Sequence, residues 1–280
     1  MAEEIVREES RKHPERRSRL NDSKEIQDIL KNSMGTDAIE GIILKLDKSK
    51  GGLSLSANAF KNLSNLRILK IQLYDPNGGS QLYFPKGHLY FPNGLDSLSD
   101  KLSYIYWESY SLASLPMGFC AEKLVEIHMP DSGVAKLWDD VQNLGNLKTI
   151  NLSFSSSLVN LPDLSMAQNL EIVELNDCTE LCSIHPSILS LPKLSYLDLT
   201  GCRKLKSLHG DKHMKSLKYL MLEGCVNLVE FLLSSEEMRS LSLVRTSIET
   251  LKLPIGRFNK LEELCLGGSL KSFQINELSC

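Results

Sequence analysis

The chain has 280 residues, with 32 Lys and Arg side chains against 35 Asp and Glu, and a formal net charge of −3. This balance excludes the overall basic field that holds nucleic acid, and no apolar run approaches the roughly 20 residues of a membrane-spanning helix. The charged N-terminal residues lack the apolar core of a secretory signal, and seven cysteines in so long a chain favour reduced thiols. We therefore expect no nucleic-acid partner and no membrane span, and a protein that works in the cytoplasm or the nucleus.

Residues 1–38 differ in composition from the rest of the chain. Apolar residues recur there at helical spacing among dense charge, and Asn21-Asp22-Ser23 offers an N-cap before the second stretch. We expect two short helices, too small to fold alone, that dock on the first repeat or belong to a further domain. The basic cluster Arg16, Arg17 and Arg19 indicates either phosphate contact or nuclear import, or a solvated helix face paired with nearby Glu residues, which we favour.

From residue 39 onward the chain is rich in leucine. Of its 50 leucines, 4 lie in the first 50 residues and 46 in the remaining 230. The motif L-x-x-L-x-L-x-x-N/C-x-x-L recurs in steps of 21 to 24 residues, and its copies begin at Leu102, Leu124, Leu147, Leu170, Leu194, Leu217, Met238 and Leu261. Earlier copies begin at Ile39 and Leu63.

This period predicts a leucine-rich-repeat solenoid, which is an α/β fold. The alternating leucines of each copy should form a strand of a parallel sheet on the concave face, and irregular or short helical limbs should return on the convex face. We assign the solenoid to residues 39–280, with about nine or ten repeats, and expect its core to form only when the repeats stack.

The period breaks at residues 74–97. This interval contains a tandem duplication in which Leu82–Gly87 and Leu89–Gly94 both begin Leu-Tyr-Phe-Pro. We expect the insertion to loop out of the solenoid. Its four aromatic rings either pack back over the neighbouring repeat, which we favour, or form a contact surface for another molecule.

Polar strand residues that alternate with the buried leucines should line the concave face. Tyr196 and Tyr219 occupy equivalent positions in successive repeats, so they should lie about 5 Å apart beside acidic residues. Such a group is either a docking site for a protein or a set of merely solvated positions, and the sequence leaves both open. The candidate partner-binding residues are Tyr104, Tyr106, His128, Asn151, Glu174, Asn176, Tyr196, Asp198, Tyr219, Met221 and Glu223.

Two groups of residues have spacings that need a chemical interpretation. Cys178, Cys202 and Cys225 recur at one motif position, and we favour buried structural thiols over a metal ladder. His209 and His213 lie four residues apart, and we favour a solvated turn over a metal site. Because no nucleophile elbow and no G-x-x-x-x-G-K-[ST] motif occurs, we expect no catalytic, cofactor-binding or metal-ligating residue.

Several segments resemble plant TIR-NB-LRR disease-resistance proteins. Pro14-Glu15-Arg16-Arg17 and Gly35-Thr36-Asp37-Ala38-Ile39-Glu40-Gly41 look like the junction where the nucleotide-binding NB-ARC region enters the repeats. Leu102-Ser103-Tyr104-Ile105-Tyr106-Trp107 and Lys123-Leu124-Val125-Glu126-Ile127-His128-Met129 resemble the repeats themselves, whereas the aromatic insertion departs from the family. The resemblance implies that residues 1–38 end an NB-ARC region, and that the repeats bind a pathogen effector or a host protein and restrain the NB-ARC region.

We therefore expect the ligand-sensing and autoinhibitory module of an intracellular plant immune receptor, active in defence and signal transduction. The family's P-loop and its NAD-cleaving TIR domain do not occur in these residues, so the resemblance implies the C-terminal part of a receptor and no enzyme. The alternative is a stand-alone repeat scaffold or decoy without signalling activity. A secreted ectodomain would carry a signal sequence and paired capping cysteines, which we do not find.

Overall fold

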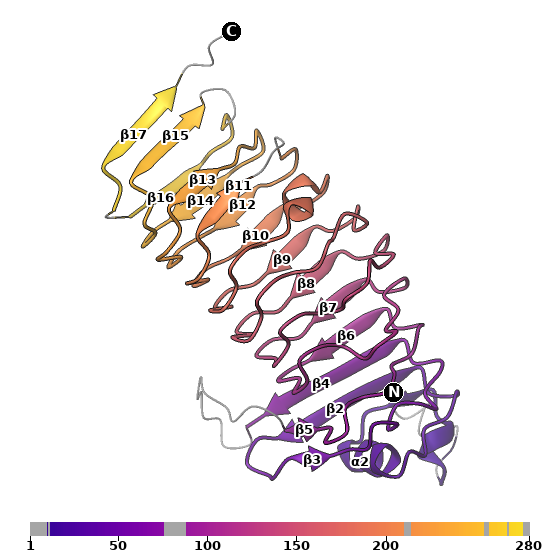
Figure 1. Cartoon of the computed structure of the whole chain (residues 1–280). Helices are drawn as coiled ribbons and strands as arrows, with labels where there is room; N and C mark the ends of the chain where they lie inside the picture. Colours follow the sequence, from indigo (N-terminus) through magenta and orange to yellow (C-terminus); the bar gives the residue numbers. More distant parts are fainter. Residues whose placement is uncertain are drawn as a thin grey trace. The chain divides into compact units, whose positions relative to one another are not determined.

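The computed structural model describes residues 10, 12–75, 88–209, 214–254, 258–267 and 269–276. The chain divides into two compact units, Met1–Val134 and Ala135–Cys280. Each unit consists of stacked repeats that contribute parallel strands to a sheet (Figure 1). The leucine-rich-repeat solenoid predicted from the sequence is therefore confirmed.

The first unit has a main sheet in the order β1-β2-β4-β6-β7, with all strands parallel. A second pair, β3 with β5, also runs parallel. Two helical segments precede the repeats, the 3-10 helix η1 (Pro14–Arg16) and the α-helix α2 (Ser23–Lys31). The strands are β1 (Arg19–Leu20), β2 (Gly41–Asp47), β3 (Leu53–Ser54), β4 (Ile68–Tyr74), β5 (Leu89–Tyr90), β6 (Tyr104–Trp107) and β7 (Glu126–His128).

Helix α2 begins at the N-cap that the sequence predicts. The Asp22 carboxylate accepts hydrogen bonds from the backbone N–H groups of Lys24 and Glu25. The helix buries Ile26, Ile29 and Leu30, whose spacing places them on one face, and it packs against β2. Ser23 Oγ accepts a hydrogen bond from the Lys45 N–H of β2 at 3.2 Å. The N-terminal segment thus docks on the first repeat, while the helix expected around Ile5 lies outside the described residues.

Two features of the N-terminal segment differ from the sequence expectation. Leu20 is part of a short strand, because Arg19–Leu20 pairs with β2 at the edge of the sheet. Arg17 does not lie on a solvated helix face, since the residue is only 4% exposed. Its guanidinium donates to Glu25 Oε2 at 2.7 Å and to the Ser10 carbonyl at 3.0 Å. Burial of the charge is offset by this pairing, which joins the first turn of α2 to the preceding segment.

The described part of the insertion packs onto the solenoid and does not loop out. Leu89–Tyr90 forms β5 beside β3, and Phe91 is 5% exposed with its ring 5.9 Å from Trp107. Trp107 also contacts Phe60 and Tyr110, with ring centroids 5.7 and 4.9 Å away. The packing that we favoured is confirmed for Phe91, whereas Tyr90 is exposed. The first copy of the duplication, Leu82–Gly87, lies outside the described residues.

The second unit repeats the same architecture. Its main sheet has the order β8-β9-β10-β12-β14-β16, and β11 pairs with β13 and β15 with β17, all in parallel. The 3-10 helix η2 spans Pro186–Ser190. The strands are β8 (Thr149–Asn151), β9 (Ile172–Glu174), β10 (Tyr196–Asp198), β11 (Ser207–His209), β12 (Tyr219–Met221), β13 (Glu230–Leu232), β14 (Ser240–Leu243), β15 (Thr250–Pro254), β16 (Glu263–Leu266) and β17 (Ser272–Asn276).

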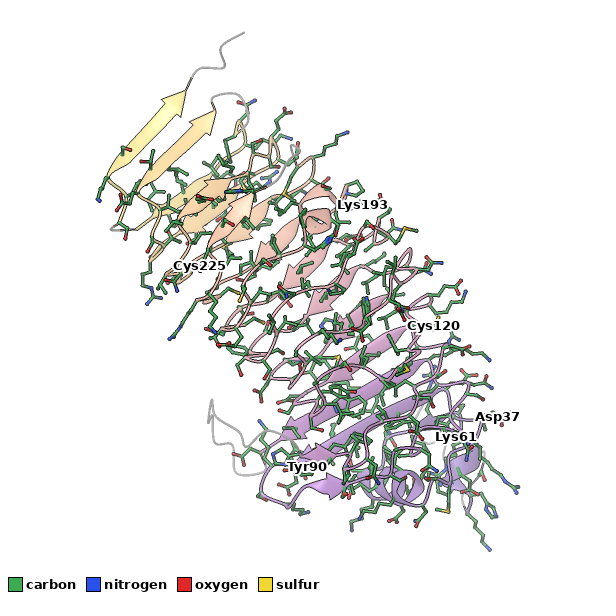
Figure 2. The ribbon with its side chains drawn as sticks, viewed as in Figure 1. Asp37, Lys61, Tyr90, Cys120, Lys193 and Cys225 are labelled. Carbon is green, nitrogen blue, oxygen red and sulfur yellow. The ribbon has the colours of Figure 1, made fainter. Side chains whose placement is uncertain are left out.

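The three recurrent cysteines stack inside the second unit. Cys178, Cys202 and Cys225 are fully buried (Cys225 is labelled in Figure 2). Each thiol donates to the carbonyl of a leucine in the preceding repeat, at Sγ–O distances of 3.2, 3.2 and 3.0 Å. Burial raises the pKa of Cys178 to about 12, so the thiol stays protonated. The prediction of buried structural thiols is confirmed.

Seven successive repeats also turn through a residue in the left-handed region just after the strand. The φ values lie between +54° and +73° at positions that recur with the repeat period. Glycine occupies two of these positions, and Gly224 has φ +73°. The full set is Ser109, Asp131, Phe154, Asp177, Gly201, Gly224 and Arg245. The leucine spacing gives no signal for this turn, because five of the seven residues are not glycine.

Candidate protein-binding face

In the first unit, three candidate residues form an aromatic group on β6 and β7. The strand register sets Tyr106 directly beside His128 and Tyr104 beside Glu126. The His128 ring centroid lies 5.7 Å from that of Tyr104 and 6.1 Å from that of Tyr106. His128 Nε2 is also 3.0 Å from Glu126 Oε2. The three rings are half-buried, and the His128 ring is tilted by 42° to that of Tyr104 and by 32° to that of Tyr106.

A cation flanks this aromatic group on the next strand. Lys70 Nζ of β4 lies 5.1 Å from the centroid of the Tyr106 ring, a cation–π distance. Burial raises the pKa of Tyr106, and so does the nearby Glu108 carboxylate, so the phenol remains neutral. The group therefore offers hydroxyl hydrogen bonds and ring faces.

In the second unit, four candidate residues line up across four neighbouring strands. The register pairs Asn151 with Glu174, Glu174 with Asp198, and Asp198 with Met221. All four are half-buried, and each precedes a leucine whose side chain is fully buried in the core. The alternation predicted from the leucine motif thus holds at these positions.

The tyrosine pair lies beside this row. Tyr196 and Tyr219 are partners in the β10–β12 register, and their ring centroids are 6.2 Å apart. The Tyr196 hydroxyl donates to Asp198 Oδ2 at 3.5 Å. Burial raises the pKa of Tyr196, and the carboxylates of Asp198 and Glu174 raise it further. Tyr219 is 38% exposed, so the pair presents accessible ring surface to solvent.

Glu174 and Asp198 differ from the acidic residues of the second unit that form ion pairs. Glu180, Glu262 and Glu237 each pair with a cation of the neighbouring repeat, in Lys204–Glu180, Arg239–Glu262 and Lys260–Glu237. Among the described residues, Glu174 and Asp198 form no ion pair. Glu174 accepts a hydrogen bond from the Asn151 amide, and Asp198 accepts one from the Thr200 N–H at 2.9 Å. Two adjacent carboxylates without a counter-charge create a negative potential suited to a cationic ligand.

Glu223 and Asn176 have partners within the chain. Arg245, in the next repeat, donates to Glu223 Oε1 at 2.8 Å, which neutralises the carboxylate. Asn176 Oδ1 accepts a hydrogen bond from Ser153 Oγ. The Glu223–Arg245 pair was not predicted from the sequence, although Arg245 follows Glu223 by 22 residues, close to one repeat. The row of half-buried residues from Asn151 to Met221 does not extend to β14, because Ser240 and Ser242 there are only 6% and 9% exposed.

His209 is exposed, as expected, but it lies on a strand and not on a turn. It belongs to β11, which pairs with β13, and its Nε2 is 3.1 Å from Glu230 Oε2. His213 lies outside the described residues. Within the described part of the chain, no group of three or more His, Cys, Asp or Glu side chains is arranged to hold a metal ion. None of the described helices is long and apolar enough to cross a membrane.

Comparison with known proteins agrees with the repeat architecture. Residues 123–142 match the family model described as Leucine Rich Repeat. Disease resistance protein RPP2A of Arabidopsis thaliana is 40% identical over 262 residues, 94% of this chain and 19% of that protein. Disease resistance protein RML1A of the same plant is 32% identical over 268 residues, 96% of this chain and 26% of that protein. The chain is a leucine-rich-repeat relative of plant disease resistance proteins.

The chain spans about a fifth of the length of RPP2A and about a quarter of the length of RML1A. The disease resistance-like protein DSC1 of Arabidopsis thaliana is similar in the same way, 37% identical over 94% of this chain and 22% of that protein. Among solved structures, the leucine-rich repeat domain of the type III effector XopL has 17% identity and a TM-score of 0.43, covering 93% of this chain and 73% of that one.

Proposed function

We propose that this chain is the protein-recognition module of a plant immune receptor, acting by binding and not by catalysis. Its relatives are named disease resistance proteins, which supports a role in defence. The observation that carries the proposal is the group Tyr196, Tyr219, Glu174 and Asp198, in which accessible rings adjoin two carboxylates without a counter-charge. Tyrosine-rich surfaces of this kind are typical centres of protein interfaces.

The chemistry of this face favours a cationic segment of the partner protein. A Lys or Arg side chain placed between Glu174 and Asp198 would relieve the repulsion between the carboxylates, and its stem would lie along the Tyr196 and Tyr219 rings. In the receptor context, we propose that the partner is a pathogen effector or a host protein in the cytoplasm or nucleus. We propose Tyr104, Tyr106 and His128 as a separate candidate contact that belongs to the first unit.

We further propose that residues 1–38 form the end of an NB-ARC region and that 39–280 form the repeat domain. The packing of α2 and β1 on β2 supports this arrangement, because it would transmit movement of the first repeat to a preceding domain. In such a receptor the repeats would restrain the nucleotide switch until a partner binds.

The test compares interaction partners of two charge-reversal variants in plant tissue. Glu174→Lys with Asp198→Lys should lose the proteins that the unaltered receptor captures. Glu180→Lys with Glu237→Lys, which changes the same charge on exposed residues outside the face, should retain them. Reversing a Lys or Arg of the captured partner should restore binding to the first variant. Equal capture by both variants would exclude this face as the binding site.

A further inference from the structure

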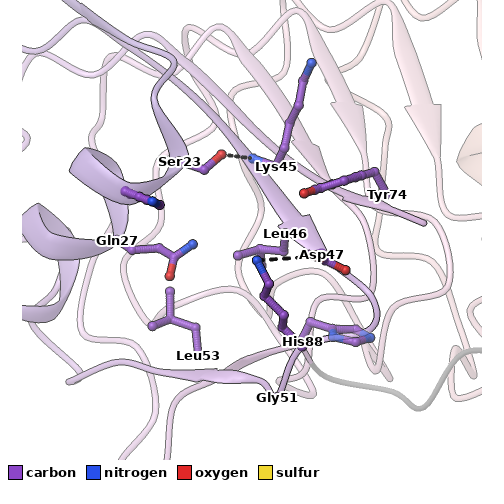
Figure 3. A pocket seen from close by; sticks show the side chains of 11 residues that line it. Ser23, Gln27, Lys45, Leu46, Asp47, Gly51, Leu53, Tyr74 and His88 are labelled. Carbon is purple, nitrogen blue, oxygen red and sulfur yellow. Dashed lines mark hydrogen bonds and ion pairs between the residues drawn. The ribbon is translucent and has the colours of Figure 1, made fainter. Parts of the chain in front are cut away.

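A cavity of about 290 Å³ lies in the first unit, apart from the strand residues discussed above. It opens where the carboxyl ends of β2 and β4 meet the first turns of α2, as Figure 3 shows. Ser23 and Gln27 of α2 form one wall, Lys45 and Asp47 of β2 form another, and Tyr74 of β4 and His88 also line the cavity. Its size suits a small molecule and not an extended polymer.

The charged side chains around this cavity leave it positive. Lys24, Lys45, Lys50 and Asp47 all line it. Asp47 is neutralised, because Lys50 Nζ lies 3.5 Å from Oδ2 while Ser49 donates to Oδ1 through its hydroxyl and its N–H at 2.7 and 2.9 Å. Lys24 and Lys45 form no ion pair with any described residue. Two lysines without an ion pair therefore line the cavity, with no free carboxylate among its described lining residues.

Three neutral polar side chains in the lining also lack partners. The amide of Gln27 and the hydroxyl of Tyr74 form no hydrogen bond with a described residue. His88 is 7% exposed, and its Nε2 is buried without a hydrogen-bond partner. A buried polar atom left unpaired destabilises the folded state, and such atoms are rare in folded proteins. A ligand that satisfies His88 would remove this unfavourable contribution.

The positive charge comes from side chains and not from the end of the helix. Asp22 already accepts the N–H groups of Lys24 and Glu25, so these donors of α2 are occupied. Burial and the nearby Lys48 lower the pKa of His88, although Glu108 opposes this shift, so the ring is neutral near pH 7. A neutral imidazole carries one donor and one acceptor nitrogen, and can therefore bind a hydroxyl group as well as a phosphate oxygen.

We propose that this cavity binds a small phosphate monoester. A phosphate monoester carries a charge of about −1.5 to −2 near pH 7, which matches the two unpaired lysines. Gln27, Tyr74 and His88 would hydrogen-bond the ester oxygen and the hydroxyl groups of the attached alcohol. A bound ligand of this kind would join α2 to the ends of β2 and β4, and so would stabilise the docking of the N-terminal segment on the first repeat.

The proposal is tested by calorimetric titration of the complete chain with glycerol 3-phosphate, inorganic phosphate and glycerol. We expect glycerol 3-phosphate to bind more tightly than inorganic phosphate, and glycerol not to bind. Lys24→Gln and Lys45→Gln should each weaken the binding about tenfold, since each removes a charged hydrogen bond. Lys31→Gln, in the last turn of α2 and outside the cavity lining, is the matched control and should bind as the unaltered chain does.

A second measurement follows His88 directly. In histidine-labelled protein, glycerol 3-phosphate should shift the ring nitrogen resonances of His88, and those of His185 in the second unit should remain unchanged. The proposal is overturned if no phosphate binds, if Lys31→Gln weakens binding as much as Lys24→Gln and Lys45→Gln do, or if the His88 resonances do not move while heat is released.

Discussion

Glu174 of β9 and Asp198 of β10 lie directly opposite each other in the parallel register, and neither carboxylate has a cationic partner among the described residues. Like charges opposed across neighbouring strands destabilise a sheet. The chain pairs comparable carboxylates elsewhere, for example Glu180 with Lys204. Stability alone would favour a neutral residue at one of the two positions, so the arrangement is consistent with selection for binding.

The first prediction follows from this repulsion. Glu174→Gln should raise the free energy of unfolding by about 0.2–1 kcal/mol, because it removes one of the two opposed charges. The new side chain can still accept a hydrogen bond from the Asn151 amide. The gain in stability should be smaller at high salt, because salt already screens the repulsion between Glu174 and Asp198 in the unaltered chain. Urea unfolding at low and high ionic strength measures both effects. Glu180→Gln is the control, and since it breaks a pair with Lys204 it should give no gain.

The second prediction concerns the stacked thiols. Burial raises the pKa of Cys178 and Cys225 to about 12, and burial together with the neighbouring thiols raises the pKa of Cys202. Raised values keep these thiols protonated, so increasing the pH from about 7 to about 9 should not expose a reactive thiolate. Iodoacetamide followed by peptide mass mapping should modify the exposed Cys182 and spare these three until urea is added. Their modification in the folded protein would contradict the buried ladder.

The third prediction concerns the left-handed turn of each repeat. Gly224 has φ +73°, and a Cβ there would make only ordinary contacts, at 3.6 Å. Gly224→Ala should therefore reduce the free energy of unfolding by about 1–2 kcal/mol through backbone strain alone. Gly145→Ala is the matched control, because Gly145 lies outside the positive-φ region and its Cβ would have room. It should be neutral or slightly stabilising in the same urea titration.

The leucine period predicts most of the second unit correctly, because strand formation there depends on residues close in sequence. Leu197 and Leu199 are fully buried while Tyr196 and Asp198 between and beside them reach solvent, as alternation requires. The strand of Arg19–Leu20 could not be predicted in this way. It consists of two residues whose pairing with β2 depends on how the whole N-terminal segment folds.

The candidate face was predictable in register but not in electrostatics. Ser242 occupies the same motif position as Asp198 and was therefore expected on the same face. It is only 9% exposed, however, and contributes little surface. The neutralisation of Glu223 by Arg245 depends on rotamers that the period does not encode. The cavity beside α2 was missed for another reason. Its lining extends from Ser23 to His88, so residues far apart in sequence meet only after the first repeats have stacked.

The fourth prediction concerns His88 and pH. Burial and Lys48 lower the pKa of His88, while Glu108, which lies 3.8 Å from Lys48, partly opposes the shift. Because the unfolded chain takes up a proton near pH 6.5 and the folded chain only at lower pH, the stability should fall as the pH drops from about 7 through the folded-state pKa.

Replacement of His88 isolates this contribution. His88→Gln keeps a polar side chain that does not titrate, so its free energy of unfolding should decline less between about pH 7 and pH 5 than that of the unaltered chain. The exposed His185→Gln is the control and should follow the pH dependence of the unaltered chain more closely. Parallel pH curves for the unaltered chain and His88→Gln would mean that the folded protein holds the His88 proton as readily as the unfolded chain. The orphaned ring nitrogen would then not reflect a neutral, desolvated imidazole at the wall of the cavity.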